Sequence, residues 1–469
     1  MTDAIRRRIV VATPDSIGER MAGPAIRAWN IAGALARQHD VELVTTTPTA
    51  ERSSTDFKVR AVSDDELRRL VDWCDIFLFQ GWIMVGREFI ARSDRIVVAD
   101  VYDPMHLEQL EQAREAGEAG RAVAIQGATA ALNEQLLRGD FFLCASEKQR
   151  DLWLGHLASL GRVNARTYDA DETLRGLIDV VAFGIDDTPP VRTGPGVKGV
   201  VPGIGLDDEV VLWGGGIYNW FDPLTLIRAV DQLRHVRPNV RLVFMGGRHP
   251  NPGVPDMQMA LDARRLATEL GVLDTHVFFN DGWVSYDERQ NYLLDADVAV
   301  STHLDHVETA FSFRTRVLDY LWAGVPVVAT MGDSLADVIS ERGLGLTVPP
   351  DDVEAVAAAI GRLLEDRELA ASCRRHAAEI APEMCWDRVL EPLRSFCAAP
   401  RRAPDLVDPE LGPRLARARR AAAPPRSTGL RHDTGLVIEH LRTGGPRLLV
   451  QRIISRVRRA VTNSRSLRG

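Results

Sequence analysis

Lysine, long apolar runs and excess positive charge are all scarce in this chain of 469 residues. Lysine occurs only at Lys58, Lys148 and Lys198, so arginine carries nearly all of the positive charge. The formal net charge of −8 argues against a general nucleic-acid-binding protein. No apolar run is long enough to span a bilayer, and residues 1–8 lack the apolar stretch of a signal peptide. We therefore expect a cytoplasmic protein.

Cysteine is also scarce, and its spacing is uninformative. Cys74 and Cys144 lie in apolar runs typical of strands, which predicts buried, reduced thiols. Residues 303–306 (His-Leu-Asp-His) come closest to a metal triad, but a single loop without supporting residues is weak evidence. We predict no metal site. The five cysteines are Cys74, Cys144, Cys373, Cys385 and Cys397.

Strand patterns alternate with helical patterns along most of the chain. This alternation predicts an α/β protein with parallel sheets covered by helices, arranged as two doubly wound, Rossmann-like domains. A segment rich in Pro and Gly separates the two series and indicates a linker. The expected parts are an N-terminal domain at 1–190, a linker at 191–205, a second domain at 206–383, a helix at 384–398 and a tail at 399–469.

The tail differs from the rest of the chain because it has many arginines and few acidic residues. Within it, residues 446–461 place apolar side chains at helical spacing with arginines opposite. This pattern is typical of a basic amphipathic helix on an anionic membrane surface. A helix that docks on the protein's own acidic body would show the same pattern, and the sequence does not separate the two interpretations.

The most informative segment follows the strand predicted at 296–301. A loop rich in His, Asp, Glu and Arg leads into a helix that carries Arg316 and Asp319 three residues apart, on one face. The helix ends at Gly324, and Pro326 opens another apolar strand. Ligands of open parallel sheets bind beyond the carboxyl ends of the strands, so we place the functional site here.

Residues 316–320 (Arg-Val-Leu-Asp-Tyr) and 324–328 (Gly-Val-Pro-Val-Val) resemble the donor site of GT-B glycosyltransferases of the retaining family 4 type. The resemblance implies two facing domains, a nucleotide-sugar donor and a terminal helix that crosses back to the first domain. It also implies that Asp319 binds the donor ribose, and that Arg316 and the adjoining loop face the pyrophosphate. That family has two Glu eight residues apart; here Phe311 stands eight before Asp319, and Glu308 is the nearest acid. The loop residues concerned are Phe311, Ser312, Phe313 and Arg314.

Further candidates come from other loops that follow strands. A glycine loop can bring backbone amides to an anion, although each glycine is about as well explained by a simple turn. At 220–222, Trp-Phe-Asp stands where the resembled enzymes usually carry Arg and Lys for the phosphates. Arg248 is a replacement cation, and Trp283 either stacks on the base or covers the core. The glycines are Gly23, Gly215 and Gly216, and Asp103 and His106 follow the strand at 96–100.

Together these features predict a retaining, metal-independent glycosyltransferase with no cofactor besides its nucleotide-sugar substrate. We expect it to act in cell-surface polysaccharide or glycolipid synthesis, peripherally at the inner face of the plasma membrane. The expected catalytic residues are His106, Asp103, Glu308 and Arg316. Two alternatives stay open: a nucleotide-sugar epimerase of the same fold, and a catalytically silent scaffold in a glycan assembly complex.

Overall fold

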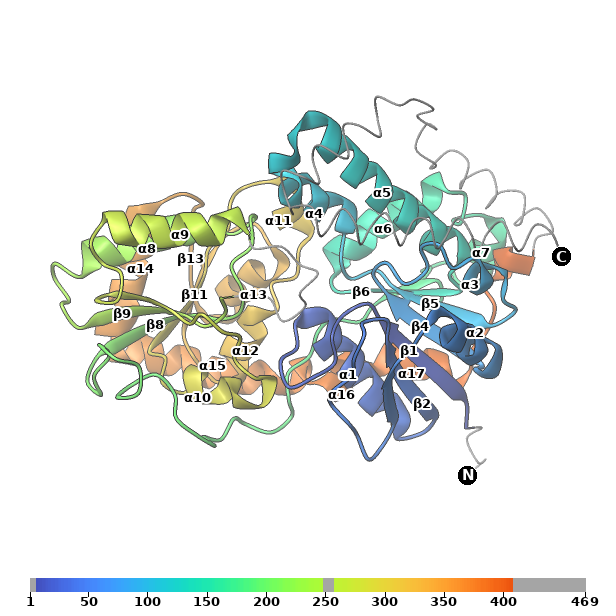
Figure 1. Cartoon of the computed structure of the whole chain (residues 1–469), viewed down its shortest axis with the longest axis horizontal. Helices are drawn as coiled ribbons and strands as arrows, with labels where there is room; N and C mark the ends of the chain where they lie inside the picture. The colour runs from blue at the N-terminus through green and yellow to red at the C-terminus, as the bar shows by residue number, and fades with distance from the viewer. Residues whose placement is uncertain (1–5, 248–256, 408–469) are drawn as a thin grey trace, which may run out of the picture. The chain divides into compact units, whose positions relative to one another are not determined.

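The computed structural model describes residues 6–247 and 257–407, which form two parallel β-sheets flanked by helices (Figure 1). The first sheet lies in the N-terminal half and the second in the C-terminal half. All paired strands within each sheet run parallel. The fold class is therefore α/β, with two doubly wound sheets of the GT-B architecture.

The N-terminal sheet has the strand order β3-β2-β1-β4-β5-β6-β7. Its central strand is fully buried from Ile9 to Ala12, as a strand covered by helices on both faces must be. The chain leaves β1 toward β2 on one side and returns as β4 on the other, which creates a crevice at the carboxyl ends. The strands are β1 (Arg8–Thr13), β2 (Asp40–Thr45), β3 (Lys58–Ala61), β4 (Ile76–Gln80), β5 (Ile96–Asp100), β6 (Phe141–Cys144) and β7 (Ile178–Val180).

Local signals explain where several helices of this half begin. Ser63 accepts a hydrogen bond from the amide of Glu66, whose side chain bonds back to Ser63, so a capping box starts α2. Ser146 caps α6 in a similar way through Gln149. The helices are α1 (Gly23–Ala36), α2 (Asp64–Trp73), α3 (Glu88–Arg92), α4 (Met105–Gln112), α5 (Gly117–Arg138), α6 (Glu147–Ser159) and α7 (Ala165–Ala170).

The C-terminal sheet has the order β10-β9-β8-β11-β12-β13, which repeats the first six positions of the other sheet. Its first strand, β8, again has neighbours that continue to opposite sides. A second crevice therefore opens at the carboxyl ends of β8 and β11. The strands are β8 (Glu209–Trp213), β9 (Val240–Phe244), β10 (Val277–Phe279), β11 (Val298–Ser301), β12 (Val327–Thr330) and β13 (Gly345–Val348).

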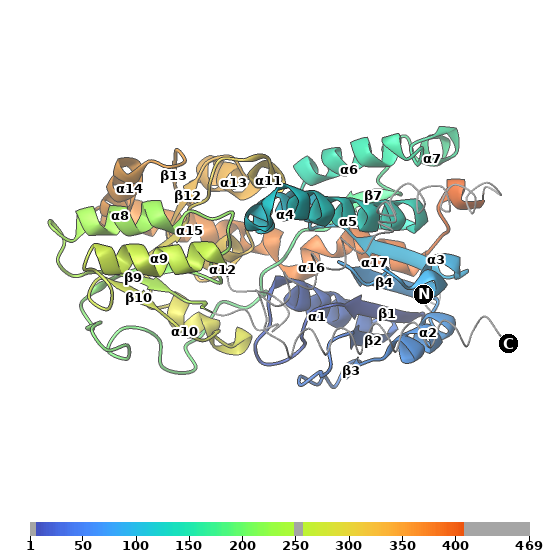
Figure 2. The same cartoon turned by 45° about the horizontal axis from the view of Figure 1, so that its top comes forward.

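The helices of this half cover both faces of its sheet. Helices α8, α9 and α14 lie together (Figure 2) and share one apolar cluster with alternate residues of β8, β9 and β11. Asp222 accepts a hydrogen bond from the amide of Thr225 and so caps α8. The helices are α8 (Pro223–Leu233), α9 (Gln258–Glu269), α10 (Arg289–Leu293), α11 (Val307–Phe311), α12 (Arg316–Trp322), α13 (Ser334–Arg342), α14 (Val353–Glu365), α15 (Arg367–Met384), α16 (Trp386–Val389) and α17 (Glu391–Ala398).

The helix predicted at 384–398 is present as two consecutive short helices, α16 and α17, which follow an extended residue at Cys385. Cys385 has an extended backbone between α15 and α16, and Ile185 pairs with it as an isolated β-bridge. Beyond the break, Phe396 of α17 stacks on Phe141 of β6, with ring centroids 4.4 Å apart. The end of the described chain therefore packs on the N-terminal sheet.

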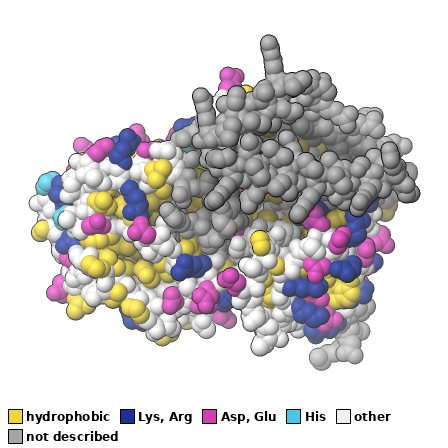
Figure 3. Space-filling model, in the orientation of Figure 1, with side chains coloured by type: hydrophobic (Ala, Val, Ile, Leu, Met, Phe, Trp, Pro, Cys, Tyr) yellow, Lys and Arg dark blue, Asp and Glu magenta, His cyan; other side chains and the backbone are white. Residues whose placement is uncertain are grey.

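Charge on the described surface is mixed. Acidic and basic side chains are interspersed on the face shown in Figure 3, and many form ion pairs. Among residues 6–247 and 257–407, no helix is both long and apolar enough to cross a membrane. The amphipathic helix expected at 446–461 lies outside the described residues.

Candidate functional site

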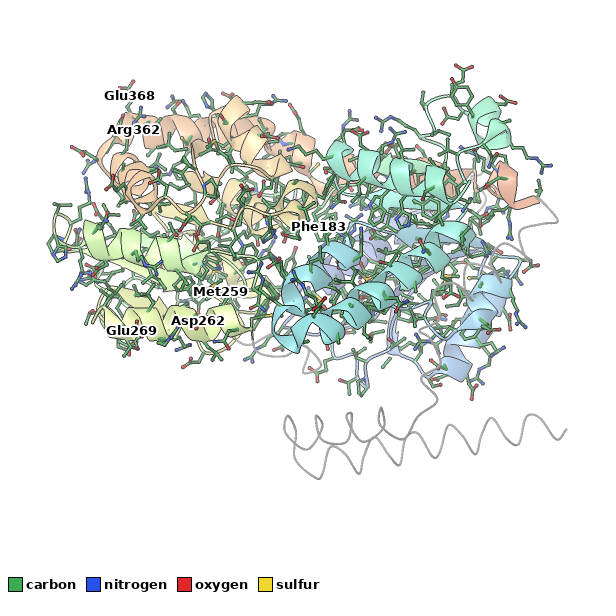
Figure 4. The ribbon with its side chains drawn as sticks, turned by 90° about the horizontal axis from the view of Figure 1, so that it is seen from above. Phe183, Met259, Asp262, Glu269, Arg362 and Glu368 are labelled. Atoms are coloured by element: carbon green, nitrogen blue, oxygen red, sulfur yellow. The ribbon has the colours of Figure 1, made fainter. Side chains whose placement is uncertain are left out.

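A cavity of about 340 Å³ lies between the carboxyl ends of the two sheets and is lined by both halves. The N-terminal half contributes the loops after β1 and β5 and the start of α4. The C-terminal half contributes the loops after β8, β9, β10 and β11. Phe183, also in the lining, lies at the boundary between the two halves in Figure 4. Eleven of the residues singled out from the sequence line this cavity: Gly23, Asp103, Gly215, Gly216, Trp283, Glu308, Ser312, Phe313, Arg314, Arg316 and Asp319.

Among the described residues, two of the expected site residues, His106 and Phe311, are not in this lining. The ring of His106 packs near Trp153, with centroids 5.8 Å apart, and burial lowers the pKa of His106 to about 4. Phe311 meets the other half through its backbone, where its carbonyl accepts a hydrogen bond from Gln149 Nε2. Arg248 lies outside the described residues.

Arg316, at the start of α12, is a buried cation of the lining. Its guanidinium lies 3.9 Å from the ring centroid of Phe221 and 4.4 Å from that of Trp213. Its Nη2 donates to the carbonyl of Gly216 at 2.8 Å, whereas Nη1 is buried without a partner among the described residues. Burial lowers the pKa of Arg316 to about 10, so the side chain is still charged at neutral pH. An anion in the cavity would satisfy the free donor.

Arg314, two residues earlier, is already paired. Both of its terminal nitrogens bond the carboxylate of Glu308, at 3.2 and 2.7 Å, and both side chains are buried. This bidentate pair places Glu308 as the counter-ion of Arg314. The cations of the cavity wall thus include Arg314, which is neutralised by Glu308, and Arg316, which has no acidic partner among the described residues.

Glycines let the backbone after β8 come close to the cavity. The amide of Gly214 donates to the hydroxyl of Tyr320 at 2.7 Å, and Gly215 has a φ of +73°. A Cβ on Gly246, at the end of β9, would lie 2.8 Å from the backbone of Gly215. The two loops therefore approach each other closely, and their glycines line the same cavity as Arg316.

Two carboxyl groups mark the N-terminal side of the cavity. Asp103 follows β5, and Glu108 lies on the first turns of α4. Burial, together with the hydrogen bond and the repulsion between the two, raises the pKa of Glu108 well above its ordinary range. Burial raises the pKa of Asp103 to about 6. The pair holds a proton near neutral pH and can both donate and accept a hydrogen bond.

The sequence indicated His106 at this place, and the helix explains why Glu108 lies there instead. Positions two apart on a helix do not share a face, whereas Met105, Glu108 and Gln112 do. Glu108 and Gln112 line the cavity, and His106 is turned toward α6. The helical period of 105–112 is the signal that could have identified Glu108.

Asp319 lines the cavity on the same helix as Arg316, and it is paired. Its Oδ1 accepts a hydrogen bond from Arg289 Nε at 3.0 Å. Arg289 lies on α10 and also lines the cavity. The sequence motif around Asp319 gave no indication of this partner.

Trp283, in the loop after β10, connects the two halves. Its Nε1 donates to the carbonyl of Met21 at 3.2 Å, and its ring lies next to Gly216. The indole therefore forms part of the cavity wall. Among the described residues, no group of three or more His, Cys, Asp or Glu side chains could hold a metal ion.

Behind the wall, Arg27 and Asp100 form a buried ion pair with N–O distances of 2.6 and 2.9 Å. The guanidinium lies about 5 Å from the ring centroids of Tyr102 and Phe183, which contact each other edge to face, and both residues line the cavity. It also donates to the carbonyls of residues 181 and 182. This pair supports the N-terminal side of the cavity.

The C-terminal half of the chain is similar in sequence to known proteins. Residues 208–366 match the model of the family described as glycosyl transferases group 1. A D-inositol 3-phosphate glycosyltransferase of Mycobacteroides abscessus is 32% identical over 221 residues, which are 46% of this chain and 45% of that protein. A phosphatidyl-myo-inositol mannosyltransferase of Mycolicibacterium smegmatis is 30% identical over 139 residues, which are 29% of this chain and 35% of that protein. The chain spans less than half the length of these curated relatives.

Solved structures resemble a larger part of the chain. The Anabaena protein HepE, in complex with UDP-glucose, aligns over 83% of this chain and 100% of its own chain, with a TM-score of 0.57 and 16% identity. Sucrose-phosphate synthase from Thermosynechococcus elongatus aligns over 84% of this chain and 98% of its own chain, with a TM-score of 0.56 and 17% identity. These likenesses concern the fold. Residues 208–366 of this chain therefore resemble the glycosyl transferases group 1 in sequence, and the chain has the GT-B fold.

Proposed function

We propose that this protein transfers a sugar from a nucleoside-diphosphate sugar to an acceptor hydroxyl. One observation carries the proposal: Arg316 is buried in the wall of a cavity between two Rossmann-like sheets and keeps Nη1 free beside a glycine loop. A buried guanidinium with an unused donor, next to backbone amides, suits a diphosphate. The relatives that match residues 208–366 are named as glycosyltransferases, which supports the same activity.

In the proposed reaction, the bond between the donor sugar and the diphosphate breaks. Negative charge then develops on the departing diphosphate, and preorganised donors stabilise it without reorganisation. Arg316 and the amides after β8 supply those donors, and Asp319 binds the ribose. Trp283 and Tyr286, which line the cavity, would contact the base.

We further propose that the anomeric configuration is retained, which is supported by the resemblance of 316–328 to the retaining family. In that mechanism a donor phosphate oxygen takes the acceptor proton, so no separate protein base is needed. Asp103 and Glu108 would then orient acceptor hydroxyls rather than move the proton. The mechanism also uses no metal ion.

The segment at 220–222 bears on the silent-scaffold alternative, because the resembled enzymes carry cations there. In this structure Phe221 supports the guanidiniums of Arg314 and Arg316, at 4.8 and 3.9 Å, and Asp222 caps α8. The positive charge comes from another loop and rests on an aromatic ring. The altered segment is therefore compatible with an enzyme.

The test is to titrate the protein with UDP, GDP and their sugar conjugates by calorimetry, and then to follow incubation with candidate acceptors by NMR. We expect one nucleoside diphosphate to bind selectively, and a product with the same anomeric configuration as the donor. An inverted product would contradict retention. Release of an altered nucleotide sugar would favour the epimerase, and absence of binding by all of them would favour the scaffold.

The basic sequence of 399–469 supports a peripheral position at an anionic membrane, where a lipid-linked or glycan acceptor would lie. Asp405 is buried and bonds Arg162 at 2.6 Å, so a truncation that spares the fold should begin after Val407. We expect the full chain, but not residues 1–407, to float with liposomes that contain anionic lipid. Equal flotation of the two would contradict the membrane role.

A further inference from the structure

We propose that Arg289 is a positioning residue: it orients Asp319 for the donor ribose and ties that carboxylate to the segment that joins the two halves. The inference rests on the proposed function, because it takes Asp319 as the ribose contact. Arg289 has no counterpart in the sequence motif around Asp319, since it lies thirty positions earlier, on α10.

The guanidinium of Arg289 uses all three of its nitrogens. Nε donates to Oδ1 of Asp319 at 3.0 Å, Nη2 donates to Oδ2 of Asp186 at 3.0 Å, and Nη1 donates to the carbonyl of Tyr286 at 2.7 Å. One cation therefore holds two carboxylates through its adjacent Nε and Nη2 atoms. Only Arg, with its rigid fork of donors, can make this set of contacts.

Two aromatic side chains fix the plane of this fork. The guanidinium carbon lies 3.8 Å from the ring centroid of Tyr286 and 4.3 Å from that of Trp322. Trp322 in turn donates from Nε1 to the carbonyl of Thr188 at 2.7 Å. The Arg289 side chain is 10% exposed, whereas that of Asp319 is 41% exposed. The cation is thus enclosed and immobilised, while its carboxylate partner stays open to a ligand.

Asp186 belongs to the first of the two segments that connect the sheets. Its neighbour Ile185 pairs with the second segment: the Ile185 amide donates to Met384 at 2.9 Å, and the Trp386 amide donates to Ile185 at 3.1 Å. The two crossings are therefore bonded together beside Asp186. Through Arg289, the carboxylate in the donor half is linked to this junction.

The pairing also explains how a short acid can serve at this position. Aspartate reaches one methylene less far than glutamate, so its orientation leaves little tolerance. With Oδ1 held by Arg289, the second oxygen is directed to the ribose hydroxyls, and the ordering cost is met before the ligand arrives. Loss of Arg289 would leave Asp319 free to rotate and would also leave Asp186 without this partner.

The test compares the dissociation constants of UDP and GDP with those of their 2′,3′-dideoxy analogues. The ratio of the two constants reports the ribose contact alone. We expect the full chain to prefer the ribose form about tenfold, as for a hydrogen bond to a charged group. Asp319→Asn should lower this ratio to near one. Arg289→Gln should lower it at least threefold, with a smaller change in the constant of the dideoxy analogue.

Two more variants keep the test decisive if Arg289→Gln folds poorly. Arg289→Lys keeps the charge but cannot bond both carboxylates, so it should restore only part of the ratio. Asp186→Asn keeps the contact with Asp319 and should lower the ratio less than Arg289→Gln. Arg265→Gln, which removes an exposed cation that pairs with Asp262 on α9, is the control and should leave the ratio unchanged.

The outcomes separate this inference from the proposed function. If neither nucleotide binds the full chain, both fail. If the full chain prefers the ribose form and Asp319→Asn abolishes the preference, but Arg289→Gln keeps it, the inference is wrong and the proposed function stands. Equal weakening of both analogues by Arg289→Gln and Arg289→Lys would show a purely structural role and would also overturn the inference.

Discussion

The guanidinium of Arg316 lies over the ring of Phe221, with its carbon 3.9 Å from the ring centroid. The two residues come from different strand–helix connections, one after β8 and one after β11. The stacking holds a buried cation beside the glycine loop without an acidic partner, because the ring face supplies the favourable electrostatic contact. A carboxylate at this place would neutralise the charge that the cavity needs for an anion.

Replacement of Arg316 by Gln should weaken nucleoside-diphosphate binding at least tenfold, because the free donor and its charge are both lost. The affinity of Arg316→Lys should lie between those of the unaltered chain and Arg316→Gln, since Lys keeps the charge but not the second hydrogen bond. Calorimetric titration with the nucleotide that binds the unaltered chain measures the effect. Unchanged affinity in Arg316→Gln would contradict the assignment of this residue.

Phe221→Leu tests the aromatic support while keeping an apolar side chain of similar size. The loss of a partly desolvated cation–π contact is worth about 1 kcal/mol, so we expect a fewfold loss of nucleotide affinity. The melting temperature without ligand should change little by comparison. A large fall in melting temperature with unchanged affinity would show that Phe221 serves the core alone.

Gly246→Ala and Gly127→Ala form a matched pair. A Cβ at Gly246 would meet the backbone of Gly215 at 2.8 Å, so the substitution should displace the glycine loop and lower nucleotide affinity. Gly127 lies inside α5 with nothing near the added carbon, so alanine there should raise stability by about 0.5–1 kcal/mol. Titration with the nucleotide and thermal melting of both variants measure these effects. Lower nucleotide affinity in Gly127→Ala and higher stability in Gly246→Ala would contradict the expectation.

The acidic pair gives a pH dependence of stability. Because burial raises the native pKa of Asp103 to about 6, the native state holds more protons than the unfolded state between about pH 4 and pH 6. The contribution of Asp103 to the free energy of unfolding therefore falls as the pH rises through that window. Above the window, the full cost of burying the ionised carboxylate is present. Asp103→Asn removes the penalty.

We expect Asp103→Asn to melt higher than the unaltered chain at pH 7.5, by about 2 °C for each kcal/mol relieved, with a smaller difference at pH 5. In Asp103→Asn the neighbour of Glu108 is neutral, so Glu108 ionises more easily. This change affects the melting temperature in the same direction. Thermal melting of both proteins across this pH range is the measurement. A difference that does not change with pH would show that Asp103 carries no such penalty.

Arg27→Met should destabilise the fold by about 3–5 kcal/mol, because Asp100 would then be buried without its partner. Burial already raises the pKa of Asp100 against the effect of Arg27, so a lone Asp100 would be neutral in the native state. The double variant Arg27→Met with Asp100→Leu should recover much of the loss. Urea unfolding of the three proteins measures this, and an unaffected single variant would contradict it.

The strand pattern was enough to predict the α/β class and the loops that meet at the cavity, because buried parallel strands read as continuous apolar runs. It also placed Arg316 and Asp319 on one helix face. Arg289 could not be found in this way. No local pattern distinguishes it, and its contacts come from α12 and the connecting segment, far away in sequence.

The break at Cys385 and the direction of His106 show two further limits. The boundary predicted at 383/384 lies within two residues of the extended Cys385, but no local pattern indicated its β-bridge to Ile185. Pro382, inside α15, was a weak signal of the break. The direction of His106 depends on where α4 begins, and helix boundaries are the least predictable part of a sequence.

The repeated strand order of the two sheets bears on how the two halves can change during evolution. Each sheet keeps its own buried core strands, and each presents its loops to the cavity from a separate stretch of chain, so the two sets can change independently. The match to the glycosyl transferases group 1 covers only the half that holds Arg316 and Asp319. Under the proposed function, exchange of residues 6–180 between related chains would change the acceptor side of the cavity while Arg316 and Asp319 remain in place.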